Sequence, residues 1–232
     1  MPYVVLALLV AGLIWRHRYD RFGWTTRSSQ VHESKLLNIA SPAFHYGILF
    51  VLAGHLVGLF VPMSWTDGLG VGEHAYHLLS LYGGTAAGLL TVGGILLLVY
   101  RRRTKAPVFR ATTANDKLMY LVLLGAIAMG MIAKLTHASG DGYNYRESIG
   151  PWARSPFTLR PDIDRMRGLP VLYQIHAVIG MALIAFIPYS RLVHMFSAPV
   201  QYLFRPYVVH RSRDPEQLGP RPERRGWEKT GA

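Results

Sequence analysis

The sequence contains no cysteine among its 232 residues, and only 16% of its residues are charged. The absence of cysteine excludes disulfide bridges, thiolate zinc sites, iron–sulfur clusters held by the chain and the CxxCH attachment of a covalent haem. Acidic residues are also scarce, because 13 Asp and Glu stand against 25 Lys and Arg, for a net charge of +12. Half of the residues are hydrophobic and the mean hydropathy is +0.19, a combination that indicates membrane spans.

Five apolar segments are candidate membrane spans, since about 20 helical residues cross a hydrocarbon core of ~30 Å. They cover residues 2–15, 43–62, 77–100, 118–137 and 169–196. The first is short, and we interpret it as a retained anchor because its basic residues follow the apolar stretch and an A-x-A cleavage site is lacking. Segments that are apolar on every face must be helices in lipid. The predicted fold class is therefore all-α, a five-span transmembrane bundle over residues 1–204.

The basic residues predict how the chain is oriented in the membrane. Nineteen of the 25 Lys and Arg fall in segments 16–42, 101–117 and 191–232, and the other six fall in 134–168. Because basic loops remain in the cytoplasm, we expect the N-terminus outside and the C-terminus in the cytoplasm. Residues 205–232 then form a basic cytoplasmic tail. The spread of charge over three segments argues against nucleic-acid binding, and these basic segments are plausible docking surfaces for soluble partners.

Four histidines lie inside the predicted spans, namely His45, His55, His176 and His194. Ionisable side chains in lipid are costly and usually functional, although a single histidine can simply hydrogen-bond a neighbouring helix. The first two are ~15 Å apart along their helix and the last two ~27 Å, so neither helix supplies both ligands of one metal. Because the two helices run in opposite directions, matching their depths pairs His45 with His194 near the cytoplasmic face. The same matching pairs His55 with His176 nearer the outer face.

Two imidazoles at each depth suit haem better than zinc. Zinc requires three or four protein ligands, whereas haem brings four equatorial nitrogens and takes axial ligands from the protein. Without cysteine the two haems would be of the b type, and two axial histidines leave no open iron position, so we expect electron transfer. Glycines at 47, 54, 58 and 180 would admit a flat macrocycle or would serve helix packing. Candidate partners of the haem propionates are Arg27, Arg110 and Arg191.

The third predicted span contains the motif Gly84-x-x-x-Gly88. Small residues four positions apart let helix backbones approach closely in membranes. The motif therefore predicts tight helix packing in this part of the bundle.

The sequence around the histidines resembles the gamma subunit of membrane-bound respiratory nitrate reductase, a dihaem cytochrome b. The matching stretches are Ser28-Ser29-Gln30, AFHYGILFVLAGHLVG (43–58), GGTAAGLLTVGGILLLVYRRR (83–103), RATT (110–113) and QIHAVIGMALIAFIPYSRLVHMFSAPVQYL (174–203). The resemblance extends over about residues 3–210. It implies five spans in a bacterial inner membrane, with His45 and His194 on the inner haem iron and His55 and His176 on the outer one.

The resemblance also implies a function. Quinol, either menaquinol or ubiquinol, would be oxidised near the outer haem with release of protons outside. Electrons would pass through the inner haem to a cytoplasmic iron–sulfur beta subunit and a molybdenum-containing alpha subunit. The chain would then be the membrane anchor and electron-transfer subunit, while nitrate would be reduced on another subunit.

The expected quinol pocket departs from the family pattern. Gly58 matches a position that lines the family's pocket. Better-studied relatives place a quinone-contacting lysine before the third span, but no Lys or Arg occurs between Phe60 and Tyr100. That window holds three candidates for the missing donor, His74, Tyr76 and His77. The two histidines are alternatively interfacial polar residues, and the quinone would then be bound in a different way.

Two other interpretations share part of this pattern. A dihaem membrane subunit of a sulfite- or heterodisulfide-linked reductase has the same ligand arrangement, although the RATT and SRLVHMFSAP stretches favour nitrate reductase by resemblance. A haem-handling or purely structural membrane protein would lack a redox titration between two centres. Reduced-minus-oxidised spectra separate these possibilities.

Overall fold

The computed structural model describes residues 1–24, 28–136 and 144–197. Within these ranges the chain is helical and has no strand, so the predicted all-α class is confirmed. Four helices are long and apolar enough to cross a membrane. They are α2 (Lys35–Phe60), α4 (Glu73–Thr104), α6 (Ala114–Thr136) and α9 (Val171–Phe186), the last counted together with the 3-10 turn that follows it to Tyr189. Arg27, His137 and the predicted basic tail 205–232 lie outside the described residues.

The first predicted span forms helix α1 (Pro2–Tyr19), which has 18 residues and is not among those four. It extends past the predicted end at residue 15. The Tyr3 hydroxyl donates to the carbonyl of Pro156 at 3.1 Å, and Arg16 Nη1 donates to the carbonyl of Pro188 at 2.8 Å. One of these bonds lies near each end of α1, and between them α1 packs against α9.

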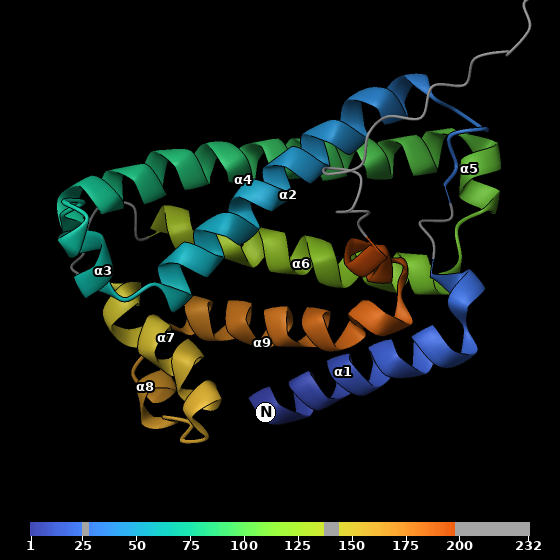
Figure 1. The fold of residues 1–232 in the computed structure, drawn as a ribbon. Helices are drawn as coiled ribbons and strands as arrows, with labels where there is room; N and C mark the ends of the chain where they lie inside the picture. The colour runs from blue at the N-terminus through green and yellow to red at the C-terminus, as the bar shows by residue number, and fades with distance from the viewer. Residues whose placement is uncertain (25–27, 137–143, 198–232) are drawn as a thin grey trace, which may run out of the picture. The chain divides into compact units, whose positions relative to one another are not determined.

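Successive long helices run in opposite directions (Figure 1). The short helices α3 (Met63–Gly68), α7 (Tyr145–Arg154) and α8 (Asp164–Arg167) lie at one end of the bundle, here named the α7 end. The short helix α5 (Ala106–Arg110) lies at the other, named the α5 end. Helix α2 packs most closely on α4, α6 packs on α9, and α9 also packs on α1.

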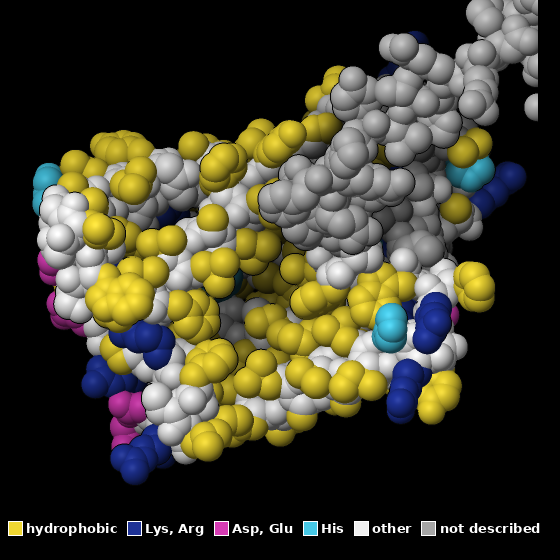
Figure 2. Space-filling model, in the orientation of Figure 1, with side chains coloured by type: hydrophobic (Ala, Val, Ile, Leu, Met, Phe, Trp, Pro, Cys, Tyr) yellow, Lys and Arg dark blue, Asp and Glu magenta, His cyan; other side chains and the backbone are white. Residues whose placement is uncertain are grey.

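The surface is that expected of a membrane protein. Large apolar side chains such as Leu49, Phe50, Leu89 and Leu121 are exposed on the long helices. Figure 2 shows hydrophobic side chains over the middle of the visible face, whereas Lys and Arg side chains gather toward its two ends. A band of this kind is stable against lipid, because the hydrocarbon takes the place of a buried core.

Glycines let α2 and α4 approach each other. A Cβ on Gly47 would lie 2.6 Å from the backbone nitrogen of Thr91, and one on Gly94 would lie very close to the backbone of Phe44. Backbone atoms cannot move aside as a flexible side chain can, so both positions require glycine. Gly47 therefore serves packing, which was one of the two predicted alternatives.

Two basic residues that were predicted to mark the cytoplasmic side are also structural. Arg101, at the end of α4, is only 2% exposed and donates to the Glu33 carboxylate and to the side chain and carbonyl of Ser29. Arg102 donates to the hydroxyls of Tyr120 and Thr112, each at 2.9 Å. Arg101 thus ties the stretch before α2 to α4, which gives the Ser28-Ser29-Gln30 match a structural reason.

The fifth predicted span is not one continuous helix, and the predicted extent 169–196 was wrong in this respect. Helix α9 ends at Phe186, and the chain continues as two 3-10 helices, Ile187–Tyr189 and Arg191–Ser197. Pro188 explains the break, because proline lacks an N–H group and disfavours helical geometry in the residue before it. The carbonyl of Pro188 is accordingly available to Arg16.

Candidate metal centres between α2 and α9

The structure brings the four predicted histidines together as two pairs. The ring centres of His45 on α2 and His194 on the second 3-10 helix are 6.2 Å apart. Those of His55 on α2 and His176 on α9 are 5.9 Å apart. These are the pairs expected from depth, although the reasoning assumed that His176 and His194 share one helix.

The spacing within each pair suits a metal ion between two imidazoles. A metal–imidazole bond is about 2 Å long. Two imidazoles on opposite sides of one metal therefore place their ring centres about 6 Å apart. Both observed distances match this value.

Three of the four imidazoles are oriented by a backbone carbonyl. The Nδ1–H of His45 donates to Ser41 and that of His55 to Val51, each at 2.7 Å. The Nδ1–H of His194 donates to Arg191 at 2.6 Å. Because a carbonyl only accepts, Nδ1 carries the proton and Nε2 keeps its lone pair, as a metal ligand requires.

His176 is held differently from the other three. Its Nδ1 is buried and makes no hydrogen bond of ordinary geometry among the described residues. Its ring packs against Gly130 of α6, where a Cβ would lie 2.8 Å from the ring. The close contact with Gly130 therefore holds the His176 ring in place. Gly130 is a site residue that the sequence reasoning missed.

The geometry around the pairs leaves room for a flat group. Helices α2 and α9 are not among the closely packed helix pairs of the described chain, although their histidines face each other. A Cβ built on Gly54 or Gly180 would meet no described atom within 4 Å. Gly54 adjoins His55, and Gly180 lies one turn after His176. The residues present therefore fit a macrocycle that bridges the two helices.

The described residues contain no group of three or more His, Cys, Asp or Glu side chains that would hold a metal ion. A bare zinc site needs at least three protein ligands. Each histidine pair provides two, which is the number that a haem with four ring nitrogens takes.

The predicted propionate partners lie in different settings. Arg191 is near His194 in sequence, and its Nε pairs with Oδ1 of the buried Asp116 at 2.9 Å. Arg110 is exposed at the end of α5. The third candidate, Arg27, lies outside the described residues.

The RATT stretch, residues 110–113, connects α5 to α6 and ends at Thr113, directly before α6. The backbone N–H of Thr113 donates to Asp116 Oδ2 at 3.0 Å, and the N–H of Asp116 donates to the Thr113 hydroxyl at 3.2 Å. This reciprocal pair is a capping box, which satisfies backbone donors at a helix start. The T-x-x-D spacing would have predicted it from sequence. Since Asp116 also binds Arg191, the cap of α6 holds the residue whose carbonyl orients His194.

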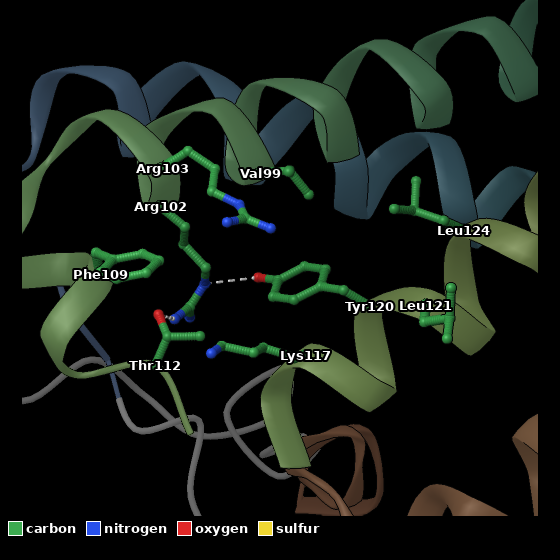
Figure 3. A pocket seen from close by; sticks show the side chains of 9 residues that line it. All are labelled: Val99, Arg102, Arg103, Phe109, Thr112, Lys117, Tyr120, Leu121 and Leu124. Carbon is green, nitrogen blue, oxygen red and sulfur yellow. Dashed lines mark hydrogen bonds between the residues drawn. The ribbon is translucent and has the colours of Figure 1, made fainter. Parts of the chain in front are cut away.

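A cavity of about 200 Å³ lies at the α5 end, between α4, α5 and α6. Its lining combines apolar side chains with three cations, Arg102, Arg103 and Lys117. Figure 3 shows Arg102 reaching toward Tyr120 and Thr112. None of the predicted site residues lines this cavity, so it is separate from the histidine pairs.

Part of the predicted quinol pocket comes together at the α7 end. A Cβ on Gly58 would lie 3.2 Å from the Tyr76 hydroxyl and 3.1 Å from the Tyr145 ring. The two tyrosine hydroxyls are 3.4 Å apart, and the Tyr145 hydroxyl is 3.3 Å from Ser80 Oγ. Gly58 and Tyr76 are thus neighbours, whereas His74 and His77 are exposed side chains on the first turns of α4.

Arg146 of α7 anchors this end and was not singled out in the sequence. Its guanidinium lies 3.8 Å from the centre of the Tyr76 ring. It donates to Glu73 at 3.1 Å and to the hydroxyl of Thr66 at 3.0 Å. A buried cation stacked on an aromatic ring and paired with a carboxylate holds α3, α4 and α7 together.

Lys134 is the third residue that the sequence reasoning missed, after Gly130 and Arg146. It was interpreted only as a charge near the end of the fourth span. In the structure its Nζ donates to the carbonyl of Ser80 on α4 at 2.6 Å. A Cβ on Gly84 would lie 2.8 Å from this Nζ, and one on Gly88 would overlap Met131. The Gly84-x-x-x-Gly88 motif therefore accommodates two side chains of α6.

Long apolar helices that place two pairs of facing histidines between them define a polytopic helical membrane protein. A family model described as nitrate reductase gamma subunit matches residues 1–213. The chain belongs to the nitrate reductase gamma subunit family, and the family predicted from the sequence is confirmed.

Individual relatives agree with this family. The nitrate reductase gamma chain of Bacillus subtilis (strain 168) is 38% identical over 213 residues, which cover 92% of this chain and 96% of the relative. The respiratory nitrate reductase 1 gamma chain of Escherichia coli (strain K12) is 34% identical over 216 residues, 91% of this chain and 94% of the relative. The nitrate reductase-like protein NarX of Mycobacterium tuberculosis (strain ATCC 25618 / H37Rv) is 54% identical over 229 residues, 98% of this chain. This chain spans only 35% of the length of that mycobacterial relative.

Proposed function

We propose that this chain is the quinol-oxidising membrane subunit of a respiratory nitrate reductase. It anchors the complex in a bacterial inner membrane and holds two b-type haems, one between α2 and α9 and one between α2 and the 3-10 helix Arg191–Ser197. Electrons from menaquinol or ubiquinol leave through this chain to an iron–sulfur beta subunit and a molybdenum-containing alpha subunit. Nitrate is reduced on the latter.

The observation that carries this proposal is the pair of facing histidines at two levels, with ring centres 6.2 and 5.9 Å apart. Three of these imidazoles present Nε2 because a carbonyl holds Nδ1. A b-type haem held by two histidines passes one electron at a time and leaves no iron position for substrate. Two such haems at different depths provide a route for electrons across the bilayer.

We further propose five spans, with the N-terminus outside. Helix α1 has 18 residues, which makes it about 27 Å long and close to the thickness of the hydrocarbon core. Its bonds to Pro156, in the 3-10 helix after α7, and to Pro188, just past α9, hold both ends of α1. The ends of α1, α4 and α5 that carry Arg16, Arg101 and Arg110 meet at the α5 end, which supports a cytoplasmic position for that end.

The residues of the chain have separate tasks under this proposal. The four histidines hold the irons, and the carbonyls of Ser41, Val51 and Arg191 keep three of the rings in one tautomer. His45 and His55 are exposed side chains of α2, and a bound group would cover them. At the α7 end, Gly58, Tyr76 and Tyr145 form the surface on which the quinol headgroup binds.

The test counts the haems in histidine variants of the complete complex. His55→Ala and His176→Ala should each remove the same one of two b-type haems, and His45→Ala and His194→Ala should each remove the other. Haem content per complex and reduced-minus-oxidised spectra measure this directly. Quinol-dependent nitrate reduction should be lost in the first two variants, because their haem lies nearest the quinol site.

The matched control is His32→Ala, an exposed histidine outside the long helices. It should leave both haems in place. The proposal fails if the complex contains no b-type haem. The pairing fails if the two variants of one pair remove different haems, or if the double variant His45→Ala/His194→Ala keeps both.

A further inference from the structure

Lys134 is a cation at the end of the apolar stretch of α6, in a candidate membrane span where a charge is costly. Such residues usually have a functional partner. A lysine near the end of a span normally extends its side chain toward the interface. Lys134 instead points to α4, where its Nζ donates to the carbonyl of Ser80 and lies against Gly84.

Within the described residues, no carboxylate forms an ion pair with Lys134. None of the salt bridges within the described part of the chain includes Lys134. An ammonium group has three donors, and its bond to Ser80 uses one of them. The side chain is half-buried, and its ammonium makes no second hydrogen bond within the described part of the chain.

The position of Lys134 relates it to the His55–His176 pair. Gly130, one turn earlier on α6, contacts the ring of His176. One helical turn is about 5 Å long, so the backbone of Lys134 lies a single turn beyond that contact, toward the α7 end. A quinol headgroup located between the Lys134 ammonium and the His55–His176 pair would contact both.

Hydroxyl groups surround the same position. The Ser80 side chain lies 3.3 Å from the Tyr145 hydroxyl, which in turn lies 3.4 Å from that of Tyr76. Gly58 of α2 lies next to both tyrosine side chains. Lys134 therefore lies beside a hydroxyl cluster whose far side is held by the Arg146–Glu73 ion pair. This setting suits a neutral diphenolic headgroup which becomes anionic on losing a proton.

We propose that Lys134 binds a hydroxyl oxygen of the quinol headgroup and stabilises the quinolate formed when that hydroxyl ionises. This inference rests on the proposed function and names a residue of its quinol site. In the ionisation the O–H bond breaks, the electron pair stays on the quinol oxygen, and the proton passes to water at the α7 end. The positive charge beside the oxygen favours this anion over the neutral quinol.

The experiment measures the affinity of a quinol analogue, a hydroxylated naphthoquinone, for the complete complex. Lys134→Met removes the charge and the donors, whereas Lys134→Arg keeps a cation. Lys134→Gln is neutral but keeps an N–H donor for the Ser80 carbonyl. We expect the Met and Gln variants to bind the analogue about tenfold more weakly or worse, because a charge-assisted hydrogen bond is lost. Lys134→Arg should retain most of the affinity.

The matched control is Lys117→Met, which removes the other lysine of α6, located at the α5 end. It should leave analogue affinity unchanged. Haem spectra and nitrate reduction with a viologen donor show that each variant is assembled. If Lys134→Met does not assemble, the Gln variant alone decides, since it preserves the bond to Ser80.

The outcomes separate this inference from the function on which it rests. If the unmodified complex contains both haems and binds the analogue, but Lys134→Gln binds it equally well, Lys134 has only a structural role and the inference is wrong. If the unmodified complex does not bind the analogue at all, the proposed quinol-oxidising function is itself wrong.

Discussion

The four histidines differ in what holds them in place. Backbone carbonyls orient His45, His55 and His194, whereas His176 is positioned by its contact with Gly130. A side chain on Gly130 would overlap the imidazole of His176. One of the four ligand positions therefore depends on a glycine that lies 46 residues away in the sequence.

The network around Arg101 predicts an acid-sensitive contact. The N–H of Leu36 and the guanidinium of Arg101 both donate to the Glu33 carboxylate, and they lower the pKa of Glu33 below its ordinary value of 4.5. A lowered pKa stabilises the fold above the ordinary value, and this stabilisation is lost as the pH falls through the folded pKa.

Glu33→Gln should therefore melt at a lower temperature than the unmodified chain at pH 6. Its melting temperature should also fall less between pH 6 and pH 3.5, because no carboxylate remains to be protonated. Thermal unfolding of the detergent-solubilised protein measures both quantities. Parallel melting curves for the two proteins over this range would contradict the role given to Glu33.

At the scale of helices, the centres of the four long spans could be predicted from hydropathy, but their ends could not. Helix α2 begins at Lys35 and α4 ends at Thr104, in polar sequence, because contacts such as Arg101 with Ser29 continue the helices past the apolar core. The predicted fifth span, 169–196, ran through Pro188 without a break. Helix α7 was not predicted, since it is short, polar and held by Arg146.

The candidate site, like the helices, could be predicted from the sequence only in part. Depth alone paired the histidines, since helix direction and rise determine where each one lies. The partner of Lys134 could not be predicted, because it lies on a different helix, 54 residues away. A cation was expected only in the segment before the third span, whereas Lys134 lies on α6.

Adjacent glycines of α4 test the packing of α2 on α4. A Cβ on Gly94 would overlap the backbone of Phe44, whereas a Cβ on Gly93 would meet no described atom within 4 Å. We expect Gly94→Ala to lower the free energy of unfolding by about 1–3 kcal/mol, the usual cost of overpacking. Gly93→Ala should cost nothing. Unfolding by titration with dodecyl sulfate measures both, and equal effects would contradict the close contact.

At the scale of the whole molecule, the missing cysteines become an experimental advantage. Any cysteine that is introduced will be the sole reactive thiol in the chain. Ile163 is 63% exposed at the α7 end, and Lys105 is exposed between α4 and α5. These positions report on the two ends of the bundle independently.

An impermeant maleimide applied to intact spheroplasts should label Ile163→Cys and should leave Lys105→Cys unmodified until the membrane is opened. A cysteine added ahead of Met1 should behave like Ile163→Cys if α1 crosses the membrane. Labelling of Lys105→Cys from outside would reverse the proposed orientation. Protection of the added N-terminal cysteine would reduce the number of spans to four.

The sparse packing between α2 and α9 has a consequence for how the protein matures. Helix α2 packs on α4, and α9 packs on α6 and α1, so the two groups meet through α4 and α6 and α2 has little direct packing on α9. Under the proposed function the cofactors would provide the direct connection between α2 and α9. Cells short of haem would then accumulate a loosely joined chain that membrane proteases degrade, so the supply of haem would set the amount of the complex as well as its activity.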